Sequence, residues 1–439
     1  MPQVSLNGSV KISLGVLAFA VTTLAQTDPG VRGGAAGAGG QVAGLTLKES
    51  KFFASGQDAF AEVASVLGTV PGTEEGLGPR FNLDSCAGCH KFPGMGGSSP
   101  ALNPQITVAP TSQVTPLQAL NIISLNGPVR EVRFATDGGV HDLFTIMGRS
   151  DTPVGCNISQ PDFASHVADL RFRIPTPTFG AGLIEAIADS AIAALESAVK
   201  PFGITGHANR SGNDGTITRF GWKAQNKSLV IFSGEAYNVE QGVTNDLFPD
   251  ERGEGGVQDP MACRMVGAGQ DHTHYDQTQP QRVPGDAVNF ANFMRFLAPP
   301  TPVSSYTGVS AASIANGAAK FALAGCTACH TPSIPTGSHD TAALAYKTAN
   351  LYSDLLVHNM GDLGDGISQG NANGNEFRTA PLWGLGQRVF FLHDGRTSDL
   401  VAAIAAHSST GSEANTVIGN FNALTTAEKQ DVLNFLRSL

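Results

Sequence analysis

The sequence is poor in basic residues, in charge of either sign and in long apolar runs. Its 439 residues include 27 Lys and Arg against 37 Asp and Glu, which gives a formal net charge of −10. Nucleic acids are bound by a surplus of cationic side chains that neutralise phosphates, so this balance excludes a nucleic-acid partner. The apolar share of 41% is high enough to build a folded core, which excludes a disordered chain. After residue 24, no run reaches the roughly 20 apolar residues that span a bilayer.

One short apolar run stands near the start of the chain. Lys11 precedes the run Ile12–Leu24, and small residues suited to a peptidase end at Ala25. This order of a basic residue, an apolar core and small residues is typical of a secretory signal peptide. We therefore expect residues 1–25 to be a cleaved signal peptide and the mature protein to be periplasmic, in an oxidising space. An uncleaved membrane anchor is the alternative, but the run is short for a bilayer.

Cysteine is scarce as well, and its placement is informative. Four of the six cysteines fall in two copies of the pattern CxxCH, "DSCAGCH" and "GCTACH", about 240 residues apart. This pattern attaches c-type haem: the two thiols bond to the porphyrin, and the histidine becomes the proximal ligand of the iron. Structural zinc and a thioredoxin-like dithiol are the rivals, but each pair carries its own histidine and neither lies in a βαβ context. The sequence therefore predicts two covalent haems, at Cys86, Cys89 and His90 and at Cys326, Cys329 and His330.

The two remaining cysteines are Cys156 and Cys263. In an exported protein, an even remainder is most simply one disulfide. Two buried free thiols are the alternative. Neither cysteine belongs to a reactive motif, so a disulfide here would tie loops together and take no part in the chemistry.

Helices are predicted on both sides of each CxxCH copy. Apolar spacing favours opening helices over 52–67 and 310–323. Closing helices are favoured over 286–297 and in the last residues of the chain, where Thr425 and Glu428 form a capping box. Each half of the chain thus repeats one order of opening helix, haem motif and closing helix.

The repeated order predicts two domains. The proline cluster Ala298–Pro302 is the best linker, so the boundaries are expected at 26–300 for an N-terminal haem domain and 301–439 for a C-terminal one. We predict a mainly α fold of two cytochrome c-like helical domains, with long irregular loop insertions and few short strands. The echo of "PTFGAG" in "PLWGLG" supports a duplication.

Beyond the haem motifs, longer stretches of the chain carry a resemblance. These are "TDPGVRGG", "PRFNLDSCAGCH", "FGAGLIEAI", "RFGWKAQN", "YSDLLVHNMGD", "FRTAPLWGLG" and "FLHDGR". The chain resembles the bacterial di-haem oxidoreductases, a family of peroxidase-like and thiol-oxidoreductase-like proteins. It is similar in turn to di-haem cytochrome c peroxidases, to the di-haem enzyme that matures methylamine dehydrogenase and to di-haem rubber oxygenases. The resemblance implies a periplasmic enzyme with a reactive N-terminal haem and an electron-transferring C-terminal haem. It also implies an external electron donor such as a small cytochrome or a cupredoxin, and dimers are common among such peroxidases.

The resemblance also assigns the sixth ligand of the C-terminal haem. In the related peroxidases this ligand lies on the helix after the HDG turn, where His407 stands, although methionine is typical there. His393 and Met360 are the alternatives, and His393 is more simply a hydrogen-bonding turn residue. Two histidine ligands would give this haem a low potential. The predicted iron ligands are therefore His90, His330 and His407.

For the N-terminal haem, "RFGWKAQNKSLVIFSGEAYNVEQGVTN" resembles a peroxidase stretch that holds a bridging tryptophan and a distal glutamate. The resemblance assigns Trp222 as the bridge and Glu240 as the acid, with Glu235 as its substitute. Peroxide cleavage needs an acid that takes a proton from the inner oxygen and returns it to the leaving one. An ordinary core tryptophan and a solvated glutamate are the alternative. His141 and His166 could also close this haem, but a lone histidine in a loop is more often structural, which is the favoured interpretation.

The sequence gives less direct evidence for a calcium site and for the reaction. By resemblance, Asp362 and Asp365 could help hold a calcium ion between the domains, but solvated loop carboxylates are the favoured interpretation. The leading hypothesis is a peroxidase-like enzyme that reduces peroxide. One alternative is a dioxygen-dependent oxygenase, which an apolar pocket around Phe232 or Tyr237 would favour. The other is a non-catalytic electron carrier in which the irons of both haems have all six ligand positions filled.

Overall fold

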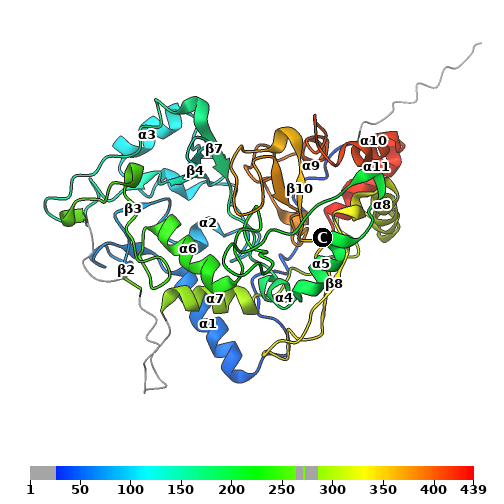
Figure 1. Ribbon diagram of the computed structural model, residues 1–439, viewed down its shortest axis with the longest axis horizontal. Helices are drawn as coiled ribbons and strands as arrows, with labels where there is room; N and C mark the ends of the chain where they lie inside the picture. Colours follow the sequence, from blue (N-terminus) through cyan, green and yellow to red (C-terminus); the bar gives the residue numbers. More distant parts are fainter. Residues whose placement is uncertain (1–25, 264–269, 272–284) are drawn as a thin grey trace, which may run out of the picture.

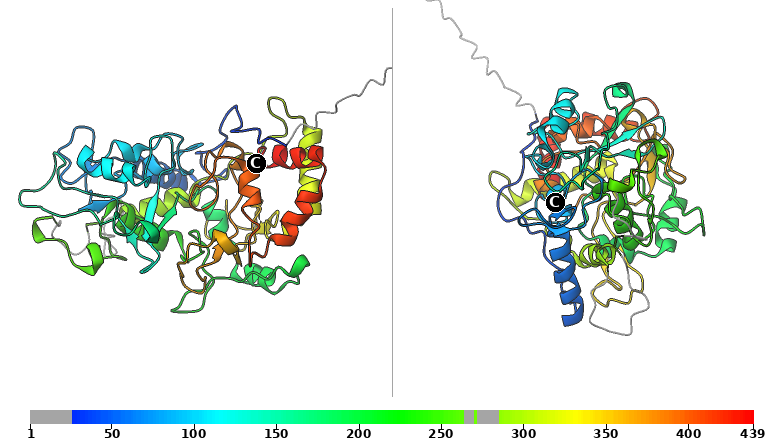
Figure 2. Two further views of the ribbon diagram at one scale, coloured as in Figure 1. Left: turned by 90° about the horizontal axis from the view of Figure 1, so that it is seen from above. Right: turned by 90° about the vertical axis from the view of Figure 1, so that its left-hand side faces the viewer.

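The computed structural model describes residues 26–263, 270–271 and 285–439, so the predicted signal peptide lies outside the described residues. The molecule is elongated, with the segments coloured cyan at one end and the C-terminal helices at the other (Figure 2). No helix in these ranges is long and apolar enough to cross a membrane.

The helices in Figure 1 are α1 (Leu47–Ala61), α2 (Cys86–Cys89), α3 (Thr111–Ala119), α4 (Ala181–Glu185), α5 (Asp189–Ser197), α6 (Leu229–Gln241), α7 (Asp286–Phe296), α8 (Ala311–Ala324), α9 (Leu400–Ala405), α10 (Asn415–Ala423) and α11 (Thr426–Leu436).

The strands are short and form small separate sheets. β4 is the middle strand of a three-stranded antiparallel sheet in the order β5-β4-β7, and the other sheets have two strands each. Helices outweigh strands, so the predicted mainly α fold is confirmed in part, but the sheets are more numerous than predicted. The described strands are β1 (Ala64–Ser65), β2 (Glu74–Glu75), β3 (Arg80–Phe81), β4 (Glu131–Phe134), β5 (Val140–His141), β6 (Phe144–Thr145), β7 (Leu170–Arg173), β8 (Ile334–Pro335), β9 (Thr348–Ala349), β10 (Val357–Asn359) and β11 (Glu376–Arg378).

In each half of the chain, two helices cross in close contact. α1 packs against α7 in the N-terminal half, and α8 packs against α11 in the C-terminal half. A glycine stands at each crossing: a Cβ on Gly56 would lie 2.3 Å from a carbonyl oxygen of α7, and one on Gly317 would lie 1.9 Å from a carbonyl oxygen of α11. Four positions after each glycine comes a buried phenylalanine, Phe60 and Phe321. The two halves therefore share one crossing geometry, which only glycine allows at these distances.

Helix α1 begins and ends earlier than the sequence suggested. The helix expected over 52–67 is instead Leu47–Ala61, because Thr46 and Glu49 form a capping box at its start. The chain after the helix enters β1, which pairs in parallel with β2. Val66, whose apolar character suggested more helix, is buried beside that strand. The predicted end of this helix was therefore wrong.

The other three predicted helices are confirmed. α7 and α8 cover the expected ranges 286–297 and 310–323 to within a residue. α11 begins at the predicted capping box, in which Thr425 accepts from the backbone N–H of Glu428 and the Glu428 carboxylate accepts from the backbone of Thr425. Strongly spaced apolar residues with a clear cap thus located these helices correctly.

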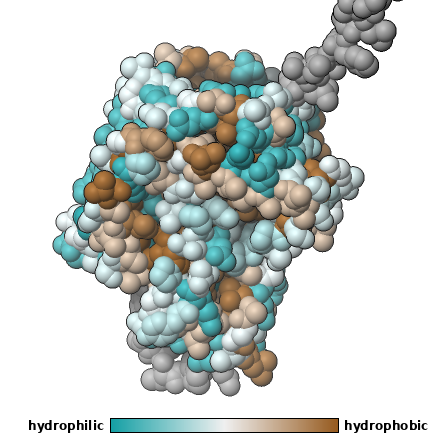
Figure 3. All heavy atoms as spheres, turned by 90° about the vertical axis from the view of Figure 1, so that its right-hand side faces the viewer, coloured by the Kyte–Doolittle hydropathy of each residue, from teal (hydrophilic) through white to brown (hydrophobic). Residues whose placement is uncertain are grey.

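Early segments of the chain pack against the C-terminal half. The guanidinium of Arg437, just after α11, pairs with Asp28 at 2.5 Å, and both side chains are buried. Lys200 pairs with Asp354, which follows the second CxxCH copy. Residues that the sequence assigned to the N-terminal domain therefore hold the C-terminal half together. On the outer face of that half, hydrophobic areas are interspersed with hydrophilic ones (Figure 3).

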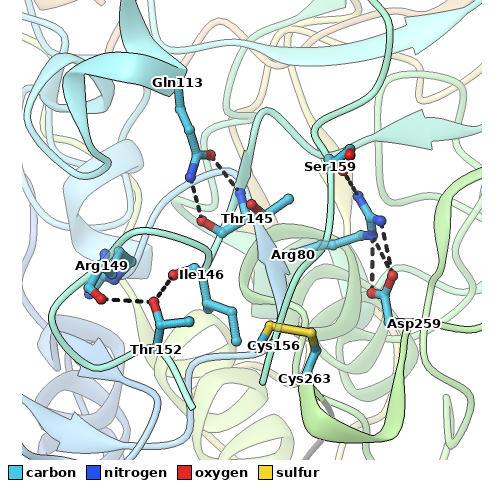
Figure 4. The surroundings of a disulfide bond; sticks show 10 residues. All are labelled: Arg80, Gln113, Thr145, Ile146, Arg149, Thr152, Cys156, Ser159, Asp259 and Cys263. Carbon is cyan, nitrogen blue, oxygen red and sulfur yellow. Dashed lines mark hydrogen bonds and ion pairs between the residues drawn. A yellow bond between two sulfur atoms is a disulfide. The ribbon is translucent and has the colours of Figure 1, made fainter. Parts of the chain in front are cut away.

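The predicted disulfide is present in the N-terminal half. Cys156 and Cys263, 107 positions apart, are bonded to each other (Figure 4). Beside the disulfide, Nε of Arg80 on β3 donates to both carboxylate oxygens of Asp259, at 3.1 and 3.0 Å, and its Nη1 donates to the carbonyl of Ser159 at 2.9 Å. The disulfide and this buried ion pair together fasten two loops to β3.

Removing the disulfide is expected to lower the free energy of unfolding by about 2–5 kcal/mol, because the cross-link restricts a long loop in the unfolded chain. Urea denaturation of the Cys156→Ser/Cys263→Ser double variant measures the loss. A thiol reductant should destabilise the wild type and leave the double variant unchanged. Equal urea midpoints for wild type and variant would contradict a stabilising role.

Candidate functional site

A cavity of about 1100 Å³ lies beside the first CxxCH copy, and we call it the N-terminal cavity. Its walls come mainly from α2, α6, α7 and β4. Apolar side chains alternate there with charged ones, so the cavity can hold both an apolar group and a reacting polar molecule. Among the residues that line it are Cys86, Cys89, His90, Glu131, Arg133, Arg173, Trp222, Phe232, Glu235, Tyr237 and Glu240.

His90 faces the N-terminal cavity at the end of α2. Its Nδ1 lies 3.0 Å from the carbonyl oxygen of Gly97. A carbonyl only accepts, so Nδ1 carries the proton and the neutral ring has its lone pair on Nε2, as in metal-bound histidines. A second backbone contact, with Thr176, also adjoins this ring. Burial lowers the pKa of His90 to about 4. The ring is therefore neutral at pH 7, which is the form that binds a metal.

A second and more apolar cavity, of about 1320 Å³, lies beside the other CxxCH copy, and we call it the C-terminal cavity. His330 and His407 both line it. Nδ1 of His330 is 2.9 Å from the carbonyl oxygen of Tyr352, and Nδ1 of His407 is 2.8 Å from that of Ala403. Burial lowers the pKa of His330 to about 4 and lowers that of His407 as well. Both rings thus have their lone pair on Nε2, as His90 does.

The two alternative ligands, His393 and Met360, line the same cavity. The ring of His393 stacks on that of Phe377, with centroids 4.0 Å apart, and the residue is buried. This stacking indicates that His393 serves to pack the core. His407 shares the carbonyl-bound Nδ1 of the two CxxCH histidines, so the geometry favours His407 as the additional ligand.

Trp222 lines both cavities and also a smaller space of about 310 Å³ beside them. Its indole Nε1 donates to the carbonyl of Ile174 at 2.9 Å, and its own carbonyl accepts from the backbone N–H of Arg378 at 2.9 Å. The side chain is thus held between a loop of the N-terminal half and β11 of the C-terminal half. This is the placement that a bridging aromatic requires.

Three glutamates line the N-terminal cavity: Glu131, Glu235 and Glu240. Glu240, in the last turn of α6, accepts from Nδ2 of Asn82 at 3.1 Å and shares a hydrogen bond with Glu131. Burial and the neighbouring carboxylate of Glu131 raise the pKa of Glu240 well above its usual value. Glu235 accepts instead from Asn226. Glu240, the predicted acid, therefore pairs with a second carboxylate. Glu235, its predicted substitute, does not belong to this pair.

Glu131 was not among the predicted site residues. Burial would raise its pKa, but the guanidiniums of Arg133 and Arg173 outweigh burial and lower it. Of the pair, Glu240 therefore holds a proton more readily, and Glu131 ionises more readily. The stretch "VREVRF" carries no signal for this role, because the two glutamates are more than one hundred positions apart and meet only in the folded chain.

Comparison with known proteins supports this assembly. Residues 112–439, most of the chain, match the family described as "Di-haem oxidoreductase, putative peroxidase". The chain belongs to this di-haem oxidoreductase family. No curated protein matches it significantly. Among solved structures, a chain of Kuenenia stuttgartiensis hydrazine synthase pressurised with 20 bar xenon aligns over 98% of this chain and 100% of that one, at 12% identity and a TM-score of 0.37. That likeness is too remote to carry an argument.

A di-haem oxidoreductase needs two haem sites, and the two cavities fit them. Each presents the cysteines of one CxxCH copy and a buried histidine whose neutral ring can offer Nε2 to a metal. Burial raises the pKa of Cys86 and of Cys326 to about 12. These thiols are therefore protonated at pH 7, which disfavours a reactive dithiol. The residues present suit haem attachment better than thiol redox chemistry.

The predicted calcium site of this di-haem oxidoreductase is occupied by the chain itself. Asp362 is exposed, whereas Asp365 is buried and pairs with Arg173 at 2.7 Å and with Lys223 at 3.1 Å. Nζ of Lys223 also donates to two carbonyl oxygens of the segment 373–376, at 2.9 and 2.7 Å. An ammonium group thus fills the oxygen cage that a cation would need, and the calcium prediction gains no support.

The two histidines proposed to close the N-terminal haem lie elsewhere. His141 and His166 stack on Phe134, with ring centroids 3.7 and 4.4 Å away, and His141 also pairs with Glu254 at 3.0 Å. Neither lines the N-terminal cavity, where His90 is the only histidine among the described residues. This cavity therefore offers one imidazole ligand, while the C-terminal cavity offers more.

His358 belongs to a buried cluster beside the second CxxCH copy that the sequence did not explain. Its Nε2 is 3.0 Å from Asp354 and its Nδ1 is 2.9 Å from Glu413. Burial opposes the charged ring, but the carboxylates outweigh it and raise the pKa of His358 well above its usual value. His358, Asp354 and Cys329 lie close enough to hold a metal ion. Because Cys329 belongs to the haem motif and Lys200 already pairs with Asp354, we assign the cluster a structural role.

Proposed function

We propose that the protein is an exported di-haem peroxidase that reduces hydrogen peroxide to two waters with two electrons and two protons. The observation that carries the proposal is the place of Trp222 on the walls of both cavities, of which one holds an acid pair. A small cytochrome or cupredoxin is the expected donor, delivering electrons at the C-terminal site. The haems, when attached, supply redox-active iron. The residues proposed to hold them are Cys86, Cys89 and His90 in the N-terminal cavity and Cys326, Cys329, His330 and His407 in the C-terminal cavity.

The acid pair of the N-terminal cavity suits the proton movements of peroxide cleavage. The inner oxygen must lose a proton, and the leaving oxygen must gain one. Glu131, kept ionised by Arg133, would accept the first proton, and Glu240 would donate the second. A proton then passes from Glu131 to Glu240, which restores the starting protonation state of both side chains. Cleavage of the O–O bond therefore takes up no net proton at this pair. The sequence had assigned both roles to Glu240 alone.

The contents of the N-terminal cavity favour a peroxidase over the two alternatives. Phe232 and Tyr237 line it, as an oxygenase would require, but Glu131 and Glu240 line it as well. A simple electron carrier would need a second strong ligand; His90 is the only histidine on the described walls of this cavity, so Met294, which also lines it, would have to supply that ligand. An open ligand position beside an acid pair is what peroxide reduction needs.

Purified protein from the periplasm tests the proposal directly. Mass spectrometry should give the mass of a chain that lacks residues 1–25 and carries two haems, and a pyridine haemochrome assay should agree. Mixing the reduced protein with hydrogen peroxide should oxidise it with a stoichiometry of two electrons per peroxide. A protein that carries haem but is not oxidised by peroxide would overturn the peroxidase assignment.

Replacing His407 with alanine is expected to convert the C-terminal site from low-spin to high-spin, because a strong ligand is lost. Electron paramagnetic resonance and cyanide binding measure the change: cyanide should bind at this site at least tenfold faster in His407→Ala than in wild type. His393→Ala is the matched control, since His393 lines the same cavity, and its spectrum should stay low-spin. A high-spin signal in His393→Ala instead would reassign the ligand.

A further inference from the structure

Two arginines in the wall of the C-terminal cavity are buried and form no ion pair within the described chain, although the carboxylate of Asp354 acts on Arg378 from a distance. Arg378, at the end of β11, keeps 6% of its surface exposed, and Arg388, just after the turn Leu385–Gln387, keeps 7%. Both line the C-terminal cavity and the smaller space beside Trp222. Nε of Arg378 donates to the carbonyl of Gly221 at 3.0 Å, but its Nη1 is buried without a hydrogen-bond partner. No carboxylate of the described chain pairs with either guanidinium.

Two other buried arginines of this chain show how such a cation can be stabilised. Arg173 pairs with a buried aspartate at 2.7 Å, and Arg437 pairs with another at 2.5 Å. A buried guanidinium without an anion loses its hydration and gains little in return. Burial lowers the pKa of Arg378 and of Arg388 to about 10, so both remain charged at pH 7. The C-terminal cavity therefore presents two guanidiniums without a paired carboxylate, and an anionic ligand would supply one.

We propose that Arg378 and Arg388 bind the propionate carboxylates of the haem attached at Cys326 and Cys329. This inference rests on the proposed function, which places that haem in this cavity. Haem carries two propionates, and a guanidinium holds a carboxylate through two parallel N–H donors. Since both arginines also line the space beside Trp222, the carboxylate edge of the cofactor lies toward the bridging indole.

The reduction midpoint of the C-terminal haem in the complete two-haem protein tests this assignment. Arg388→Gln is expected to shift the equilibrium about tenfold toward the oxidised state, a fall of 59 mV for one electron, because a cation that stabilises the reduced state is lost. Arg378→Gln should act in the same direction. The propionate bands in the resonance Raman spectrum should move in both variants, and Arg388→Lys should recover part of the shift.

Arg396→Gln is the matched control, because it removes the same charge from an exposed side chain that pairs with Asp394. Its midpoint should equal that of wild type. If both haems are attached and peroxide is reduced, but neither cavity variant moves the midpoint more than Arg396→Gln does, the propionate assignment is wrong and the proposed function stands. If no haem is attached, both proposals fall. Should Arg378→Gln fail to fold, Arg388→Gln and Arg388→Lys decide the outcome.

Discussion

Glu240→Gln is expected to lower kcat for hydrogen peroxide reduction by roughly 10²–10⁴-fold, the contribution typical of a general acid. Glutamine keeps the size of the side chain and can still bond with Asn82, which holds Glu240 at 3.1 Å. It resembles the neutral form that burial and Glu131 impose on Glu240. What glutamine lacks is the acidic proton for the leaving oxygen, so substrate binding should change little while turnover falls.

Steady-state kinetics with a reduced small cytochrome as donor measures this loss. Glu235→Gln is the matched control, because Glu235 lies on the same helix and lines the same cavity but bonds with Asn226. Its kcat should stay within a few-fold of wild type. Glu131→Gln should lower kcat as well, because the proton acceptor is lost. A wild-type rate in Glu240→Gln, or a larger loss in Glu235→Gln, would show that the acid has been misassigned.

The second large effect is expected at Lys223, whose side chain is fully buried. Its ammonium contacts Asp365 at 3.1 Å and the carbonyls of Asn373 and Glu376 at 2.9 and 2.7 Å. Lys223→Met keeps the apolar stem but leaves these oxygens without their cation. Removing one partner of a buried ion pair costs about 3–5 kcal/mol. Because Trp222 is the preceding residue, the indole between the two cavities should also become less firmly held.

Urea denaturation followed by circular dichroism measures the change in the free energy of unfolding, and tryptophan fluorescence reports on the surroundings of the two tryptophans, Trp222 and Trp383. The matched control is Lys227→Met. Lys227 forms an ion pair with Asp214 at the surface, where 41% of its side chain is exposed, and such pairs contribute little. Equal losses in Lys223→Met and Lys227→Met would mean that the buried ammonium does not fasten the two halves.

The features that the sequence predicted well are those with short, fixed spacings. The CxxCH copies and the capping box of Thr425 and Glu428 are local patterns whose meaning does not depend on distant contacts. The capping box of Thr46 and Glu49 is of the same kind and would have placed the start of α1 correctly. The end of that helix was harder, because the apolar residues after position 61 suit a buried strand as well as a helix.

The features that escaped prediction depend on segments far apart in the chain. Glu131 reaches Glu240 only because β4 and α6 border one cavity, and no spacing rule links them. Lys223 looked like an ordinary polar neighbour of Trp222, and only the fold surrounds it with oxygens of the C-terminal half. Charge alone could not reveal Arg388 either, since burial without a partner is a property of the folded chain.

The ion pair between Asp28 and Arg437 links maturation at one end of the chain to stability at the other. Asp28 stands three positions after Ala25, where we propose that the leader is removed. A peptidase that cut a few residues too late would take away the carboxylate that holds a guanidinium with 1% of its side chain exposed. Such a trimmed chain would keep both haem motifs but lose the ion pair behind α11, so the proposed processing would have to be accurate for the C-terminal helix to pack as described.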